Sequence, residues 1–253
     1  MLGIMGGSGW SKIDWLDNEE KRMVQTPFGK PSAPLQFARY SDSAAVGNPQ
    51  EAICFLGRHG ESHTIAPHTV NYRANVHAMW EAGVDAIIAI NAVGACSAAF
   101  SSGSLVLPDQ IIDYTYGREH TFFDTLEDFS SHVDFTEPFD VALRQRLLAC
   151  ASAVDIPLHD GGTYGCTQGP RFESAAEIRK IARDGCDVVG MTLMPEAALC
   201  RERRIPVACI CMVVNPAAGV ADGVISIADI EQAMATASTN VADILKHHLV
   251  SPA

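Results

Sequence analysis

The chain has 253 residues, 47% of them hydrophobic, which is enough for one large α/β domain, or two small ones, with a real core. Its net charge of -12 and pI near 5.1 argue against binding to nucleic acid or to an anionic membrane, because both need clustered Lys and Arg. No basic segment precedes the first apolar residues and no apolar run is long enough to span a bilayer, so we expect a cytoplasmic protein.

The eight cysteines are scattered along the chain, several of them within apolar, strand-like segments. They form no CxxC pair and have no histidines at zinc-site spacing, so we expect reduced and mostly buried thiols. His59, His63 and His68 lie close together in the sequence but lack carboxylates at ligand spacing. We therefore expect no metal site.

The first predicted strand, residues 2–5, leads into the glycine-rich turn Gly6-Gly-Ser-Gly9. The missing side chains let backbone N–H groups face outward there, and Ser8 adds a hydroxyl, so this turn could bind an anion. It has neither the lysine of a P-loop nor the spacing GxGxxG. A turn without a ligand is the alternative interpretation.

Two further strands are predicted at 34–40 and 52–56, separated by a polar loop at 41–50. The second strand ends in Gly57-Arg-His-Gly60, so Arg58 and His59 lie where open α/β sheets bind ligands. An arginine at such a position can bind phosphate through two parallel N–H groups. A helix at 71–80 follows, with apolar residues at helical spacing.

Residues 84–90 form a nearly uninterrupted apolar run, typical of a strand buried on both faces, and Asn91-Ala-Val-Gly-Ala95 follows its end. The small side chains there leave room for a ligand. A strand is predicted at 105–114 and an amphipathic helix at 138–154. Between them, residues 118–136 form a long, polar and aromatic loop, which is typical of a functional segment or an interface.

The segment Thr167-Gln-Gly-Pro-Arg-Phe-Glu173 lies between a β-rich run and a predicted helix at 175–183. Phe172 could stack on a flat heterocycle while Glu173 accepts a hydrogen bond from a ring N–H. Equally, Phe172 could be a packing anchor and Glu173 a cap of the next helix.

The last predicted elements are a strand at 187–190 that leads to Met191 and Thr192, a helix opened by Glu196, a buried strand at 206–214 that ends at Asn215, and a closing helix at 227–249. Strand and helix alternate without a linker-like segment. We therefore predict a single α/β domain over residues 1–253, with a central mixed β-sheet flanked by helices.

Taken in order, these motifs resemble the trimeric purine nucleoside phosphorylase and methylthioadenosine phosphorylase family over nearly the whole chain. Six motifs in the right order are far more specific than any one of them. They are Gly6-Gly-Ser-Gly9, Arg58-His-Gly60, His68-Thr-Val-Asn-Tyr-Arg-Ala-Asn75, Asn91-Ala-Val-Gly94, Thr167-Gln-Gly-Pro-Arg-Phe-Glu173 and Gly190-Met-Thr-Leu-Met-Pro-Glu196.

The resemblance implies the nucleoside phosphorylase fold, a homotrimer, and a pentosyl transfer in which inorganic phosphate is the co-substrate and no cofactor takes part. The residues that it implies for phosphate are Ser8, Arg58, His59, the Ala92 backbone N–H and Thr192. Those that it implies for the nucleoside are Phe172, Glu173 and Asn215 at the purine, Met191 at the ribose, Ile227 and Ile230 at the 5′ group, and His132 from a neighbouring subunit. The expected catalytic residues are Asn215, Glu173 and His59.

Within the family the chain is most similar to a bacterial branch that cleaves methylthioinosine. Asn215 and Ala217 stand where the methylthioadenosine branch has aspartates. An amide can donate to O6 and accept from protonated N7, so we expect a 6-oxopurine. A 6-amino base would leave a buried polar group unpaired, which costs about 1 to 3 kcal/mol. Ile227 and Ile230 favour a 5′-methylthio group over a hydroxyl.

Several alternatives stay open at this point. An inosine and guanosine phosphorylase would share the base site but need a polar group for the 5′-hydroxyl, and a methylthioadenosine phosphorylase of broad base specificity would accept both bases. A nucleosidase would need no phosphate. A non-catalytic purine-binding protein and a Rossmann-type dehydrogenase are less favoured, the latter because the glycine-rich turn does not fit a dinucleotide.

Overall fold

The computed structural model describes residues 1–10, 13, 15, 17–40, 51–125, 131–222 and 226–251. Within them the chain forms a mixed β-sheet with helices, which confirms the α/β class predicted from the sequence. The strands are β1 (Leu2–Gly6), β2 (Asp17–Arg22), β3 (Leu35–Tyr40), β4 (Glu51–Gly57), β5 (Ala86–Ala95), β6 (Leu105–Leu107), β7 (Gln110–Asp113), β8 (Leu158–Asp160), β9 (Thr163–Cys166), β10 (Val188–Gly190) and β11 (Val207–Pro216). The α-helices are α1 (Tyr72–Glu81), α2 (Val141–Ala153), α3 (Ala175–Arg183), α4 (Leu193–Glu202) and α5 (Ile227–Val250), and a short 3-10 helix, η1, spans Pro67–Thr69.

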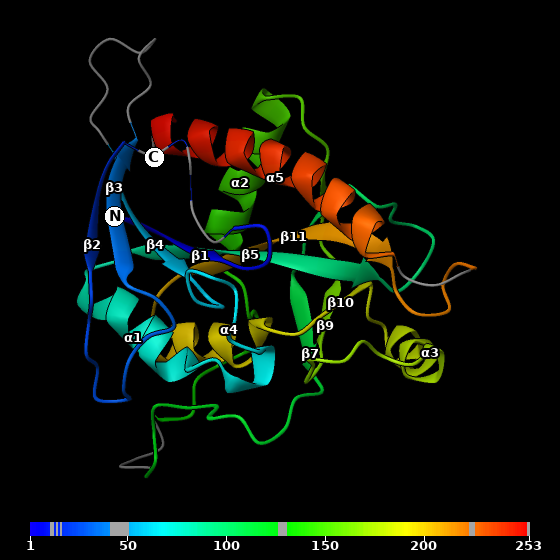
Figure 1. Ribbon diagram of the computed structural model, residues 1–253, viewed down its shortest axis with the longest axis horizontal. Helices are drawn as coiled ribbons and strands as arrows, with labels where there is room; N and C mark the ends of the chain where they lie inside the picture. Colours follow the sequence, from blue (N-terminus) through cyan, green and yellow to red (C-terminus); the bar gives the residue numbers. More distant parts are fainter. Residues whose placement is uncertain are drawn as a thin grey trace.

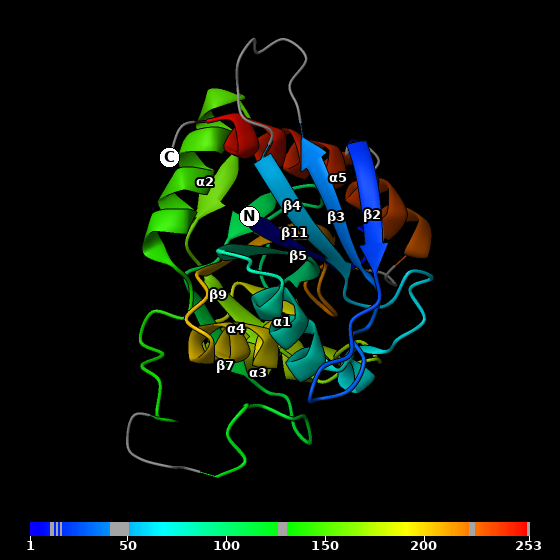
Figure 2. The ribbon, with the colours of Figure 1, turned by 90° about the vertical axis from the view of Figure 1, so that its left-hand side faces the viewer.

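The sheet lies between two layers of helices (Figure 1). Helices α2 and α5 cover one face and pack on each other, whereas α1 and α4 cover the other face. Figure 2 shows the same order after a 90° turn, with α5 above the strands and α1 and α4 below them. Of the helices in the described part of the chain, none combines the length and the apolar composition that crossing a lipid bilayer requires.

Strand β5 explains why the central apolar run is continuous. Ile87 and Ala89 belong to the core under α1 and α4, whereas Ile88 and Ile90 belong to the core under α2 and α5. All four side chains are fully buried. Because successive side chains of a strand point to opposite faces, a strand covered on both sides needs an apolar residue at every position.

The sheet opens along one edge of β5. On that edge β1 pairs with residues 86–90, and β10 pairs only with Gly94 and Ala95. On the other edge β11 runs parallel to β5 along most of its length. Residues 91–93 therefore have no partner among the described strands on the first edge.

Three details differ from the expectation, each for a physical reason. Strand β5 continues to Ala95, so the segment Asn91-Ala-Val-Gly-Ala95 belongs to the strand and does not follow it. The predicted strand at 105–114 is two strands, because the chain changes partners at Pro108, which has no N–H to donate. The sequence pattern does not indicate β2, because an edge strand can carry polar side chains such as those at 20–22.

The helices agree more closely with the expectation. Helix α3 spans the predicted residues, and α1 begins after Asn71, whose side chain accepts a hydrogen bond from the Ala74 N–H. In α4, Met194 has extended backbone angles, so the regular helix begins at Pro195, as the sequence predicts. The polar loop at 41–50 and residues 126–130 of the aromatic loop lie outside the described residues.

Candidate active site

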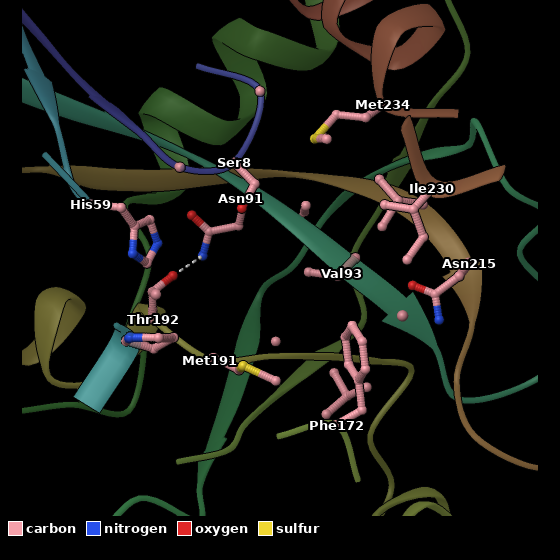
Figure 3. A pocket seen from close by; sticks show the side chains of 18 of the residues that line it. Ser8, His59, Asn91, Val93, Phe172, Met191, Thr192, Asn215, Ile230 and Met234 are labelled. Carbon is pink, nitrogen blue, oxygen red and sulfur yellow. Dashed lines mark hydrogen bonds between the residues drawn. The ribbon is translucent and has the colours of Figure 1, made fainter. Parts of the chain in front are cut away.

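A cavity of about 660 Å³ opens where the parallel strands β1, β4, β5 and β11 end. Figure 3 shows that it has two ends: Ser8, His59 and Thr192 lie at one, and Phe172 and Asn215 lie at the other. The sequence-predicted residues that line it are Ser8, Arg58, His59, Ala92, Phe172, Glu173, Met191, Thr192, Asn215, Ile227 and Ile230. Segments far apart in the sequence are thus brought to one place.

The glycine-rich turn after β1 packs closely against the strand ends beside it. The Gly7 N–H donates to the Ile90 carbonyl oxygen over 3.0 Å. A Cβ at Gly7 would lie 2.7 Å from that oxygen and 2.7 Å from Arg58 Nη1, so only glycine fits. The next residue, Ser8, lines the cavity, with its Oγ 3.3 Å from His63 Nε2.

Arg58 is fully buried, and its planar fork faces Glu196. Nε donates to Oε2 of Glu196 over 2.6 Å, and Nη2 donates to Oε1 over 2.7 Å. Nη1 and Nη2 also donate to the carbonyl oxygens of Ile90 and Met5, both at 3.3 Å. Of the five N–H groups of Arg58, these contacts with described residues use four and leave one, on Nη1, without a partner among those residues. The prediction that Arg58 binds phosphate through two parallel N–H groups is therefore wrong, because Glu196 receives that contact.

His59 presents a lone pair to the cavity. Its Nδ1 lies 2.8 Å from the Ile65 carbonyl oxygen, which can only accept, so Nδ1 carries the proton. Burial and the nearby Arg58 guanidinium lower the pKa of His59 to about 4, so the ring is neutral at pH 7. Nε2 can then only accept a hydrogen bond. A phosphate oxygen that carries a proton would supply the donor.

Asn91 holds Thr192 in place across the cavity floor. Asn91 Nδ2 donates to Thr192 Oγ1 over 3.1 Å, the dashed line in Figure 3, and to the Tyr164 hydroxyl over 3.3 Å. Because Oγ1 accepts this bond, the Thr192 hydroxyl proton is left for a ligand. Both residues are buried.

The other amide atom of Asn91 has no partner. Oδ1 is one of a few buried polar atoms without a hydrogen bond among the described residues, and of these it alone belongs to a residue that lines the cavity. A buried acceptor left unpaired costs free energy, so a ligand or a water that donates to it is favoured. The role of the Asn91 side chain could not be recognised from the sequence, where Asn91 is only part of a motif of small residues.

The backbone N–H of Ala92 faces the open edge of the sheet. Within a strand, residues two apart direct their N–H and C=O groups to the same edge. The Ile90 carbonyl accepts from Gly7 on the β1 edge, so the Ala92 N–H points to that edge too. There it lies between the ends of β1 and β10. This is the orientation that the predicted backbone donor requires.

At the other end of the cavity, Phe172 and Glu173 follow the turn after β9. The phenyl ring points into the cavity and is 51% exposed, so it is not a packing anchor (Figure 3). Ser174 and Glu177 form the capping box of α3, so Glu173 is not the helix cap. Instead, Glu173 Oε1 accepts a hydrogen bond from Thr167 Oγ1 over 2.6 Å.

Asn215 lies on β11, opposite Phe172 in Figure 3. Its Nδ2 donates to the Pro216 carbonyl oxygen over 2.6 Å, and its Oδ1 is directed into the cavity. Because an amide nitrogen carries two hydrogens, one N–H of Asn215 is left beside that oxygen. The side chain can therefore accept and donate at the same edge of a flat ligand.

The wall between the two ends is mainly apolar. Met191 lies below it, and Ile230 and Met234 of α5 lie above it (Figure 3). Ile227 also lines the cavity but is 62% exposed. Glu231, which is not among the predicted site residues, also lines the cavity.

His132 is not brought to the cavity of its own chain. It is exposed on the aromatic loop and does not belong to the described residues that line the cavity. Among the residues that sequence reasoning missed, Glu196 pairs with a partner 138 positions away, a separation over which no spacing rule applies. His63 is a second such residue, and its ring lies 4.6 Å from that of His59. In the sequence, only its closeness to His59 could have indicated a place at the site.

Comparison with known proteins decides the family. The model of the phosphorylase superfamily matches residues 1–249. This chain belongs to the phosphorylase superfamily. The match spans nearly the whole chain and confirms the resemblance drawn from the motifs.

Members of the superfamily resemble this chain closely. A protein of Pseudomonas syringae pv. tomato named probable S-methyl-5′-thioinosine phosphorylase is 47% identical over 92% of this chain and 92% of its own length. The 6-oxopurine nucleoside phosphorylase of Pyrococcus furiosus is 40% identical over 96% of this chain and 90% of its own length. Methylthioadenosine phosphorylase from Schistosoma mansoni, solved in complex with adenine, has a TM-score of 0.87 at 29% identity, over 98% of this chain and 90% of that one. The nucleoside phosphorylase fold expected from the sequence is thereby confirmed.

Proposed function

We propose that this protein cleaves S-methyl-5′-thioinosine with inorganic phosphate, giving hypoxanthine and 5-methylthioribose 1-phosphate. The observation that carries the proposal is the two-ended cavity, with the hydroxyls of Ser8 and Thr192 at one end and Phe172 with Asn215 at the other. A nucleoside that bridges the two ends puts its anomeric carbon between an anion and a base. The relatives named probable S-methyl-5′-thioinosine phosphorylase support the same reaction.

The reaction is a substitution at the anomeric carbon. As the N-glycosidic bond breaks, positive charge develops on the sugar and negative charge on the departing purine, so the site must stabilise both. Phosphate held by Ser8, Thr192 and the Ala92 N–H stabilises the sugar cation by its own charge. Its oxygen then bonds to the anomeric carbon while the purine leaves with the electron pair of the broken bond. No covalent intermediate with the protein is required.

His59 and Asn91 set the protonation state of the phosphate. His59 Nε2 is an acceptor at the end of the cavity that would hold the anion, and Asn91 Oδ1 is a buried, unpaired acceptor of a residue that lines the cavity. An acceptor pairs with a phosphate oxygen only if that oxygen carries a proton. We therefore infer that phosphate binds as a protonated anion, with a different oxygen directed at the sugar.

Asn215 and Glu173 act on the purine. As electrons move into the ring, N7 takes up a proton from water, which is balanced by the proton that phosphate loses on becoming the ester. Asn215 Oδ1 accepts the hydrogen bond of the new N7–H. The remaining N–H of Asn215 donates to O6 of hypoxanthine. Glu173 accepts from N1–H, a proton that hypoxanthine has and adenine lacks. These contacts favour a 6-oxopurine.

A second candidate is a 6-oxopurine nucleoside with a 5′-hydroxyl, such as inosine. Glu231 lines the same wall as Ile227 and Ile230, and its carboxylate could accept a hydrogen bond from that hydroxyl. The relative named 6-oxopurine nucleoside phosphorylase points in this direction as well. Of the two candidates we place the methylthio nucleoside first, because Ile230 and Met234 make the wall mainly apolar.

A homotrimer is part of this proposal. His132 is exposed and lies away from the cavity of its own chain, while Ile227 and Phe172 are 62% and 51% exposed at that cavity. Apolar side chains so exposed at a substrate site are typical of a cavity completed by another subunit. A sedimentation experiment measures the subunit number directly.

The decisive experiment is an assay for release of hypoxanthine or adenine from methylthioinosine, methylthioadenosine and inosine, each with and without phosphate. The proposal expects phosphate-dependent release of hypoxanthine, fastest from methylthioinosine. Release that does not depend on phosphate would indicate a nucleosidase instead. Faster release from inosine would favour the second candidate.

A further inference from the structure

Arg118 is a buried arginine outside the cavity whose five N–H groups each find an acceptor. Nε donates to the Gln168 side-chain oxygen over 3.2 Å, and Nη2 donates to the carbonyl oxygens of Gln168 and Thr167 over 2.9 and 3.2 Å. Nη1 donates to the Met194 carbonyl oxygen over 2.6 Å and to the Tyr72 hydroxyl over 3.2 Å. An arginine has five such donors, so the set is complete.

Four of these five acceptors lie in two segments beside the cavity, and the fifth, the Tyr72 hydroxyl, belongs to α1. Thr167 and Gln168 begin the turn that carries Phe172 and Glu173. Met194 lies two residues after Thr192 and three after Met191, both of which line the cavity. One guanidinium thus fastens the base-binding turn to the segment that bears the ribose and phosphate contacts.

Besides Arg118, the Thr167 N–H ties the start of the base-binding turn to the Gly190 carbonyl oxygen over 2.8 Å. Residues 167–173 contain neither helix nor strand, and Phe172 is half exposed, so packing alone does not fix the turn. Glu173 is oriented by Thr167 Oγ1, and the carbonyl oxygen of that same Thr167 accepts from Arg118. A shift of the turn would therefore move the Glu173 carboxylate and the Phe172 ring together.

We infer that Arg118 is a positioning residue for base recognition, which holds the turn of Phe172 and Glu173 in register with the segment of Met191 and Thr192. The inference rests on the proposed function, because it concerns the affinity of that site for a 6-oxopurine. Arg118 touches no substrate in this role. It also joins the start of the aromatic loop to the base site, since it is the first residue of that loop.

The matched control is Arg144, another arginine that ties backbone segments together. Its side chain is 11% exposed, and it donates to the carbonyl oxygens of Pro108 and Leu107 and to Asp160. It does not belong to the residues that line the cavity. The variants Arg118→Lys and Arg144→Lys each keep the charge but replace five donors of fixed geometry by three on a flexible stem.

The experiment measures the dissociation constant for hypoxanthine by calorimetry and the KM for phosphate in the phosphorolysis assay. For Arg118→Lys we expect hypoxanthine affinity to fall by about tenfold and the KM for phosphate to change by less than about twofold. Arg144→Lys should lower thermal stability about as much as Arg118→Lys does. It should leave the hypoxanthine affinity and the KM for phosphate unchanged. If Arg118→Lys fails to fold, Gln168→Ala removes one of the five acceptors and should weaken hypoxanthine binding by about threefold.

Two results would overturn the inference. One is a folded Arg118→Lys variant, or Gln168→Ala in its place, that binds hypoxanthine as the unmodified protein does. The other is an equal loss of hypoxanthine and phosphate affinity in both lysine variants, which would show general destabilisation only. The unmodified protein serves as the test of the proposed function: if it neither binds hypoxanthine nor cleaves the nucleoside, that proposal fails independently of Arg118.

Discussion

Arg58 and Glu196 form a completely buried, bidentate ion pair directly beneath the anion end of the cavity. Removing one partner of such a pair leaves an unpaired charge in the core. We expect Glu196→Ala to lower the free energy of unfolding by about 3 to 5 kcal/mol, measured by urea denaturation. The exposed pair of Arg22 and Glu20 on β2 is the control, and Glu20→Ala should have a much smaller effect. Equal effects of the two substitutions would contradict this account of the buried pair.

Stability should fall in mild acid. Burial is the main cause that lowers the pKa of His59 and of His248 to about 4, from 6.5. The unfolded chain therefore takes up protons at a higher pH than the folded chain does, so stability is complete above about pH 6.5 and decreases as the pH falls toward 4.

Urea unfolding between about pH 7.5 and about pH 4.5 measures this dependence. His248→Gln removes an imidazole of α5 that lies against Cys150 of α2 and does not line the cavity. This substitution should make the dependence of stability on pH shallower. An unchanged slope in that variant would show that His248 is not one of the groups responsible.

Asn91 should act on phosphate and not on the base. Asn91→Ala removes both the hydrogen bond to Thr192 and the unpaired acceptor at the anion end. We expect the KM for phosphate to rise by about tenfold while hypoxanthine affinity stays the same. Initial rates at varied phosphate, together with calorimetry of hypoxanthine binding, separate the two effects. A phosphate KM equal to that of the unmodified protein would remove Asn91 from the anion site.

Asn215 should decide the choice of base. Asn215→Ala removes the acceptor for N7–H, and we expect kcat/KM for methylthioinosine to fall by about 100-fold. Asn215→Asp replaces the donor to O6 with an acceptor and should shift the ratio of adenine to hypoxanthine release toward adenine. The measurement is a competition between methylthioinosine and methylthioadenosine. Full activity of the alanine variant would refute the base-recognition role.

Glu231 should decide the choice of 5′ group. If its carboxylate accepts from a 5′-hydroxyl, Glu231→Leu lowers kcat/KM for inosine about fivefold relative to methylthioinosine. Ile230→Glu adds a charge to the same wall and is expected to shift the ratio the opposite way. Both substrates are assayed at equal concentration. A ratio that neither variant changes would mean that this wall does not contact the 5′ group.

Most of the strands and helices could be predicted from the sequence, and all of the predicted site residues except His132 line the cavity. Strand ends marked by Arg58 and by Asn215 are informative because parallel strands bring their carboxyl ends together. The partner of Arg58 could not be predicted, because Glu196 reads only as an acidic residue at a helix start. The orientation of Asn91 depends on Tyr164 and Thr192, which are 73 and 101 positions away.

Strand β5 carries residues of both ends of the cavity on one uninterrupted stretch of backbone. Asn91 and Gly94 are three residues apart, and at about 3.3 Å per residue the rise between them is about 10 Å. The strand thereby fixes the distance between the end of the cavity that would hold the phosphate and the end that would hold the purine. Loops of variable length could not fix this distance. Side chains around β5 can differ between enzymes that act on different substrates. An inserted or deleted residue in β5 would instead change the distance between the two ends of the cavity.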